Sequence, residues 1–183
     1  MRIAALLPLL LAACSSLVPS TLMRLQALDP LTADPSGIEL ALVLPDGLRP
    51  QPQGARLEFK ADRAGHSVAE TFVLEPRPAP SLPEAKGVVM AFGLSRADAA
   101  RMRAAQSAVA AWPQDGQSHG SLGVALDACL TGGPLPPTAE GGVLIKLEQE
   151  HGFQPLVRPT PITALIGAEA MAGLRPCGNP ALP

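Results

Sequence analysis

Alternating apolar and polar positions recur along the chain and predict a protein built mainly of β-strands. Positions 55–62 give the clearest example, because alanine, leucine and phenylalanine at odd positions face one way and charged residues face the other. This period of two is typical of an antiparallel strand with one solvated face. A tight connection at 63–66 leads to a second strand at 67–74, so we predict a β-hairpin.

Other stretches of similar character complete the predicted sheet. Short apolar or alternating runs predict strands at 38–44, 87–94, 122–130 and 143–149, and an edge strand interrupted by prolines at 153–158. Positions 21–28 suit either a strand or a short helix. We expect the proline-rich stretches 49–54 and 76–83 to be loops, since proline donates no hydrogen bond to a strand ladder.

One long helix is predicted from about Arg96 to Trp112. Ser95 is suited to cap its N-terminus, and Asp98 follows three residues later, as in a capping box. A shorter helix is expected at 163–172. The apolar face of the long helix, which we expect to pack on the sheet, consists of Met102, Ala105, Val109 and Trp112.

These elements predict an α+β fold. The chain of 183 residues has a length suited to one domain, which we place at 21–183. We expect a mainly antiparallel sheet of six or seven strands with the long helix packed on it. The alternative is a sandwich of two sheets with the helix as a lid.

The first fourteen residues have the pattern of a secretory signal. Arg2 precedes an apolar stretch at 3–11, which as a helix would rise about 14 Å and cannot span a hydrocarbon layer of about 30 Å. It ends in Leu-Ala-Ala followed by Cys14. This motif resembles the lipobox of bacterial lipoprotein precursors, in which the cysteine is acylated and the peptide before it is removed.

The resemblance implies an anchor and a compartment. Residues 1–13 would be the signal peptide, Cys14 the site of lipid attachment, and 14–20 a tether that reaches only about 20 Å. Acyl chains on Cys14 would hold the domain on a bilayer. Because Ser15 rather than aspartate follows the cysteine, the resemblance favours the outer membrane, facing the periplasm.

The remaining two cysteines fit an exported protein. Cys129 and Cys177 form an even pair, and exported thiols meet an oxidising environment. We therefore predict a disulfide between them, which in the chain-entropy model stabilises the fold by about 4 kcal/mol. The alternative is two free, buried thiols. No clustered cysteine or histidine spacing accompanies either residue, so no metal site is predicted.

Composition and charge exclude one class of partner. The formal net charge is −2, and the chain has five aromatic residues and no tyrosine. A protein that binds nucleic acid needs a basic surface and, for single strands, stacking rings. We therefore predict no nucleic-acid partner.

Residues suited to catalysis are scattered. His66, His119 and His151 stand alone in predicted turns or loops, and no Gly-x-Ser-x-Gly motif occurs. Glu148 and Glu150 share a strand face, but so few aromatic residues make a sugar site unconvincing, and we expect solvated side chains. No catalytic, cofactor-binding or metal-binding residue is predicted, and we expect a protein without enzymatic activity.

Two functions of different kinds remain. The first is a lipoprotein that docks onto another protein of the cell envelope, which predicts a filled core and an exposed patch or strand edge. The second is a binder or carrier of an apolar small molecule, which predicts an open aliphatic cavity under the face that carries Met102 and Trp112. An enzyme ranks third.

Overall fold

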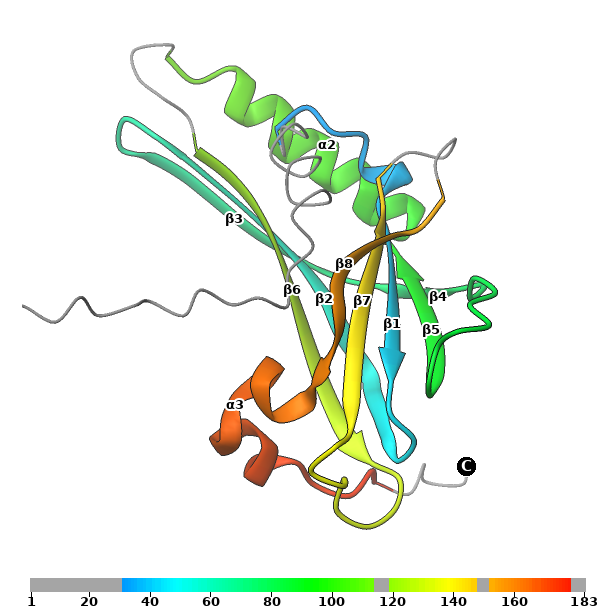
Figure 1. Cartoon of the computed structure of the whole chain (residues 1–183). Coiled ribbons are helices and arrows are strands. Elements are labelled where there is room, and N and C mark those ends of the chain that lie inside the picture. The colour runs from blue at the N-terminus through cyan, green and yellow to red at the C-terminus, as the bar shows by residue number, and fades with distance from the viewer. Residues whose placement is uncertain (1–30, 114–118, 148–151, 179–183) are drawn as a thin grey trace, which may run out of the picture.

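The computed structural model describes residues 31–113, 119–147 and 152–178. Several predictions concern residues outside these ranges. They are the signal peptide 1–13, Cys14, the tether 14–20, the ambiguous segment 21–28, His151, and the pair Glu148 and Glu150. Within them, eight strands and two α-helices form an α+β fold (Figure 1). The predicted fold class is confirmed.

The strands are divided between two antiparallel sheets. A five-stranded sheet has the order β4-β5-β1-β7-β8, and a three-stranded sheet has the order β3-β2-β6. The two-sheet division corresponds to the alternative drawn from the sequence rather than to a single sheet. The strands are β1 (Glu39–Leu44), β2 (Leu48–Arg63), β3 (His66–Val73), β4 (Glu75–Arg77), β5 (Val88–Gly93), β6 (His119–Leu130), β7 (Glu140–Lys146) and β8 (Gln154–Pro161).

The predicted hairpin is present as β2 and β3. Arg63 pairs with His66, so the connection is the two-residue turn of Ala64 and Gly65, both with positive φ. Such turns match the right-handed twist of the flanking strands. The charged residues at the even positions 56–62 lie on the more exposed face, and Leu57, Phe59 and Ala61 are at most 2% exposed, as the alternation predicted. Arg63, the last residue of β2, lies on the buried face and is 8% exposed.

The proline-rich stretch 49–54 differs from prediction, whereas 76–83 differs only at its start, because 78–83 lie outside any strand as predicted. Residues 49–54 belong to β2, where the register with β6 shifts between Pro50 and Ala55. This irregularity admits two prolines, because bulged residues need not donate to the ladder. Pro76 lies in the short strand β4, which pairs with β5 at the edge of its sheet. Proline is tolerated at such edges, and the sequence pattern alone did not reveal the pairing.

A single hydrophobic core joins the two sheets. β1 contributes Leu40, Leu42 and Leu44 from one face, and β2 and β3 contribute Phe59 and Phe72, which are fully buried. Both sheets therefore depend on the same buried contacts.

Helix α2 (Arg96–Ala110) lies at the top of the molecule in Figure 1. The Ser95 side chain accepts a hydrogen bond of 2.9 Å from the backbone N–H of Asp98, so the predicted cap is present. Met102 is 0% and Val109 1% exposed, and Arg101 lies 5.0 Å from the ring centroid of Phe72 on β3. The predicted packing face is confirmed.

Helix α3 (Ile162–Gly173) lies at the lower left in Figure 1, away from α2. Of its residues only Ile162 is buried, no side chain caps its N-terminus, and Gly167 interrupts it with φ 83° and ψ 160°. This backbone conformation is essentially restricted to glycine. The segment is thus two short helical turns joined by a kink. Among the described residues, no helix is long and apolar enough to cross a membrane.

Candidate functional site

The hydrophobic core is open along β6. In the ladder of β2 and β6, Leu57 stands opposite Val124 and Phe59 opposite Leu122, so these pairs share one face of the sheet. Leu57 and Phe59 are buried, whereas Leu122 is half-buried and Val124 is 46% exposed. The inner face of this sheet therefore becomes uncovered at its β6 edge.

The five-stranded sheet opens in the same way. Leu42 of β1 is buried, and it stands opposite Val143 of β7, which in turn stands opposite Val157 of β8. Val143 and Val157 are both only half-buried. Each sheet thus presents an apolar face that loses its cover toward an edge strand, β8 in one and β6 in the other.

Between these edges lies a groove of about 730 Å³, which we call the α3 groove. Its volume falls within the range of about 300 to 1,000 Å³ that is usual for small-molecule sites. Its lining is almost entirely aliphatic, and no aromatic side chain contributes. The lining residues are Leu42, Val43, Leu44, Leu48, Gln51, Leu122, Val124, Leu126, Asp127, Ala128, Gly141, Gly142, Val143, Leu156, Val157, Ile162, Leu165, Ile166, Ala170, Gly173, Leu174 and Arg175.

Exposed apolar side chains are concentrated at this groove. Val124, Leu165 and Ile166 are three of the five large apolar side chains that are exposed in the described part of the chain, and all three line it. Single exposed apolar residues are ordinary, but a cluster of them around a concave surface marks a binding site. The groove is therefore the candidate functional site.

The lack of a side chain at Gly141 allows α3 to lie close to β7. A Cβ atom at this position would lie 2.7 Å from Ile162 Cδ1 and 3.2 Å from the carbonyl oxygen of Val43. A side chain there would push Ile162 outward, and Ile162 is the only buried residue of α3. The absence of a side chain at Gly141 thus allows α3 to form one end of the groove.

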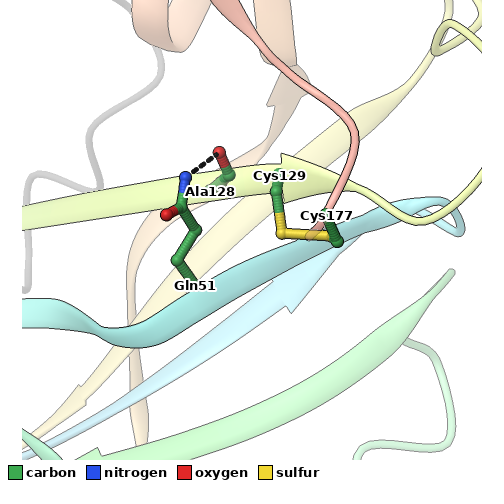
Figure 2. Close-up of a disulfide and its surroundings, with 4 residues drawn as sticks. All are labelled: Gln51, Ala128, Cys129 and Cys177. Atoms are coloured by element: carbon green, nitrogen blue, oxygen red, sulfur yellow. Dashed lines mark hydrogen bonds between the residues drawn. A yellow bond between two sulfur atoms is a disulfide. The ribbon is translucent and has the colours of Figure 1, made fainter. Parts of the chain in front are cut away.

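The C-terminal end of α3 is fastened to β6 by a disulfide and hydrogen bonds. Cys129 and Cys177 lie at bonding distance, with Cα atoms 4.8 Å apart, so the predicted pairing is found (Figure 2). The N–H of Leu130 donates to the Arg175 carbonyl at 2.9 Å, and the N–H of Cys177 donates to the Leu130 carbonyl at 2.7 Å. The tail that lines the groove is therefore fixed to its wall.

Polar residues lie only at the rim. The Arg56 guanidinium contacts Asp127 Oδ2 at 2.6 Å, and the hydrogen bond from Arg56 lowers the pKa of the Asp127 carboxyl. Gln51 Nε2 donates to the Ala128 carbonyl at 3.4 Å, a contact drawn beside the disulfide in Figure 2. Since Asp127 stays ionised and is neutralised by Arg56, the acidic side of the rim carries little net charge.

Described side chains fill the core beneath α2, so the cavity that the carrier hypothesis predicted under Met102 and Trp112 is not found there, and the filled core is what the docking hypothesis predicted. Met102 is fully buried against the core, and Trp112 is half-buried and stacks on His66 with ring centroids 5.6 Å apart. Neither Met102 nor Trp112 lines the α3 groove. An open aliphatic space lies instead beside the short helix α3.

The predicted chemical residues do not converge on the groove. His66 is exposed at the start of β3 and does not line the groove, and His119 is the first residue of β6. Among residues 31–113, 119–147 and 152–178, no group of three or more histidine, cysteine or acidic side chains gathers as metal ligands do. The groove therefore offers shape and apolar contact, with few groups for acid or base chemistry.

The α3 groove was missed by the sequence reasoning, although one signal pointed to it. Residues 162–173 contain a single charged residue, Glu169, and have no polar face. A helix that is apolar all round is normally buried. Such a segment at 162–173 therefore indicates either packing against an apolar surface or a site where another molecule binds.

No protein family model, curated protein or solved structure matches this chain.

Proposed function

We propose that this protein is a lipid-anchored component of the bacterial cell envelope that binds an apolar small molecule in the α3 groove. The function is binding or carriage, without a catalytic step. The observation that carries the proposal is the open, aliphatic groove between the edges of the two sheets, where Val124, Leu165 and Ile166 remain exposed.

The apolar lining supports binding on energetic grounds. Each methylene group that leaves water for such a surface contributes about 0.8 kcal/mol. A ligand that covered the exposed part of Val124 and its neighbours would remove unfavourable apolar surface from the protein as well as from itself. Because the groove is already formed, little of this gain is lost in ordering the protein.

The proposed anchor gives the groove a source of ligand. Acylated Cys14 and Leu31, the first described residue, are separated by residues 15–30, which span at most about 55 Å when extended. The domain would therefore remain within reach of the bilayer that holds the acyl chains. We place the protein at the outer membrane, facing the periplasm, on the basis of Ser15 after the lipobox.

A fluorescent apolar probe tests the groove. N-phenyl-1-naphthylamine, whose emission rises in apolar surroundings, is titrated into the protein purified from membranes in a maltoside detergent. We expect saturable binding above the detergent background, and a loss of about tenfold or more in affinity for Val124→Glu, which buries a carboxylate against the ligand.

Val88→Glu is the matched control, because Val88 is also an exposed strand valine, 38% accessible, and lies outside the groove. It should bind the probe as the unaltered protein does. Equal probe binding by Val124→Glu and Val88→Glu, or no saturable binding by the unaltered protein, would contradict the proposal.

The anchor has a separate test. Cys14→Ser should leave an unprocessed or unacylated precursor, because the residue that carries the lipid is absent. Mass spectrometry of the mature N-terminus should find an acylated cysteine in the unaltered protein. A bare N-terminus at any other residue would refute the lipoprotein assignment while leaving the groove untouched.

Docking onto another envelope protein is the second candidate. It is favoured by the same exposed cluster and by the position of β6 and β8, which are the outer strands of their sheets among the described residues. The probe experiment separates the two, because a docking surface would lose a protein partner in Val124→Glu without showing saturable uptake of a small molecule.

A further inference from the structure

We propose that the ligand of the α3 groove is a long-chain fatty acid, with its alkyl chain along the aliphatic lining and its carboxylate at Arg175. This inference rests on the proposed function and specifies the ligand class. It follows from three features of the groove: the kind of side chains in its lining, the balance of charge at its rim, and the way in which Arg175 is mounted.

The lining favours a flexible alkyl chain over a ring. Apart from Gln51, Asp127 and Arg175, the lining consists of leucine, isoleucine, valine and alanine together with three glycines, and no aromatic residue is present to stack against a planar ligand. Branched aliphatic side chains pack equally well against any conformation of a methylene chain. A long alkyl chain therefore matches this surface better than an aromatic ring does.

Charge at the rim favours an anionic head. Asp127 and Arg175 are the two charged residues of the lining. Asp127 is paired with Arg56 at 2.6 Å, whereas Arg175 has no carboxylate within ion-pair distance in the described part of the chain. Glu169 on α3 is exposed and does not line the groove. Arg175 thus leaves one uncompensated positive charge beside an apolar channel.

Arg175 also has free donors for a carboxylate. Its Nη1 donates to the Ala172 carbonyl at 3.3 Å, which engages one of the five N–H groups of the guanidinium. The remaining donors are arranged as a planar fork that matches the two oxygens of a carboxylate. A single arginine balances a monoanion, whereas a phosphate monoester carries a charge of about −1.5 to −2, so we assign a carboxylate head.

The backbone of Arg175 is held in place. Its carbonyl accepts from the N–H of Leu130, and two residues later the Cys177 N–H donates to the Leu130 carbonyl, beside the disulfide to Cys129. A binding residue on a fixed segment pays less to bind than one on a free loop. The disulfide therefore has a positioning role at this end of the groove.

Competition between a fatty acid and its neutral ester tests the proposal. The full-length protein, purified from membranes in a maltoside detergent, is exposed to diazirine-labelled palmitate and light, and labelled protein is measured by mass spectrometry. Palmitate should displace the label at about a tenfold lower concentration than methyl palmitate, the difference typical of one charge-assisted hydrogen bond.

Variants at Arg175 test whether this residue causes the difference between the acid and the ester. Arg175→Ala should remove the preference for the acid and leave competition by the ester unchanged, and Arg175→Lys should restore part of it. Arg96→Ala is the control, because Arg96 is an exposed arginine on α2 that is not part of the groove. It should retain the full preference.

Each other result has a distinct meaning. Label in the groove with equal displacement by acid and ester would overturn the fatty acid proposal and leave the apolar-binding function standing. An equal loss of both competitors in Arg175→Ala would show that the residue only maintains structure, which also overturns it. Absence of label at any groove residue would overturn the proposed function itself.

Discussion

Two helices of this protein differ in composition and in what they do to the core. Both contain several alanines, but α2 carries four charged residues, whereas Glu169 is the one charged residue of α3. Helix α2 begins at a capping serine, buries Met102 and Val109 completely and closes the core above β2 and β3. Helix α3 has no cap, buries Ile162 alone and lies over a groove that stays open.

The difference shows how an apolar segment can be kept at a protein surface. A helix that is stabilised by burial cannot leave its apolar side chains exposed, since burial is the source of its stability. Helix α3 is instead held at both ends, by Ile162 packed against Gly141 and by the disulfide at Cys177. Its middle turns therefore contribute to the groove without being part of the core.

Removal of the disulfide should change the free energy of unfolding more than the other substitutions proposed for the two helices. The double variant Cys129→Ala and Cys177→Ala loses a cross-link that closes a loop with a sequence separation of 48. The chain-entropy model gives a loss of about 4 kcal/mol in the free energy of unfolding. Urea unfolding followed by circular dichroism measures it.

The same variant should affect α3 more than α2. Hydrogen exchange at α3 amides should accelerate far more than exchange at α2 amides, because only α3 loses its attachment. Alkylation of the unaltered protein before reduction provides the control and should modify neither cysteine. Two reactive thiols in that control would contradict the predicted pairing.

Truncation of one apolar side chain on each helix should come next. Met102→Ala leaves a cavity in a filled part of the core and should cost about 2 to 5 kcal/mol. Ile166→Ala, at a position 43% exposed, should cost less than about 0.5 kcal/mol. Chemical denaturation compares the two, and equal losses would show that α3 is packed as firmly as α2.

Loss of the cap should have the smallest effect. Ser95→Ala removes the acceptor for the Asp98 N–H and should destabilise the protein by about 1 kcal/mol. Ser107→Ala is the matched control, because Ser107 is exposed in the same helix and its hydroxyl donates only to the Arg103 carbonyl four residues earlier. Because alanine has the higher helix propensity, this variant should leave the melting temperature unchanged or raise it slightly, and a comparable loss there would show that the effect is not specific to the cap.

Much of the fold could be predicted from local patterns. The alternation at 55–62, the capped helix after Ser95 and the pairing of Cys129 with Cys177 all appear in the structure. The pattern failed where proline dominated, because the bulge between Pro50 and Ala55 and the short strand around Pro76 are defined by their partners. The partner of β2 at the bulge is β6, far along the chain, and β5 follows β4 only after residues 78–87, so composition did not indicate either pairing.

The candidate site was less predictable than the fold. Local sequence determined which positions are apolar and which segments are helical, because periodicity and capping act over a few residues. Only the tertiary structure decided that the inner faces of β6 and β8 lack cover and that α3 lies beside them. Whether an apolar side chain is buried depends on what packs against it from distant parts of the chain, and that information is carried by no single segment.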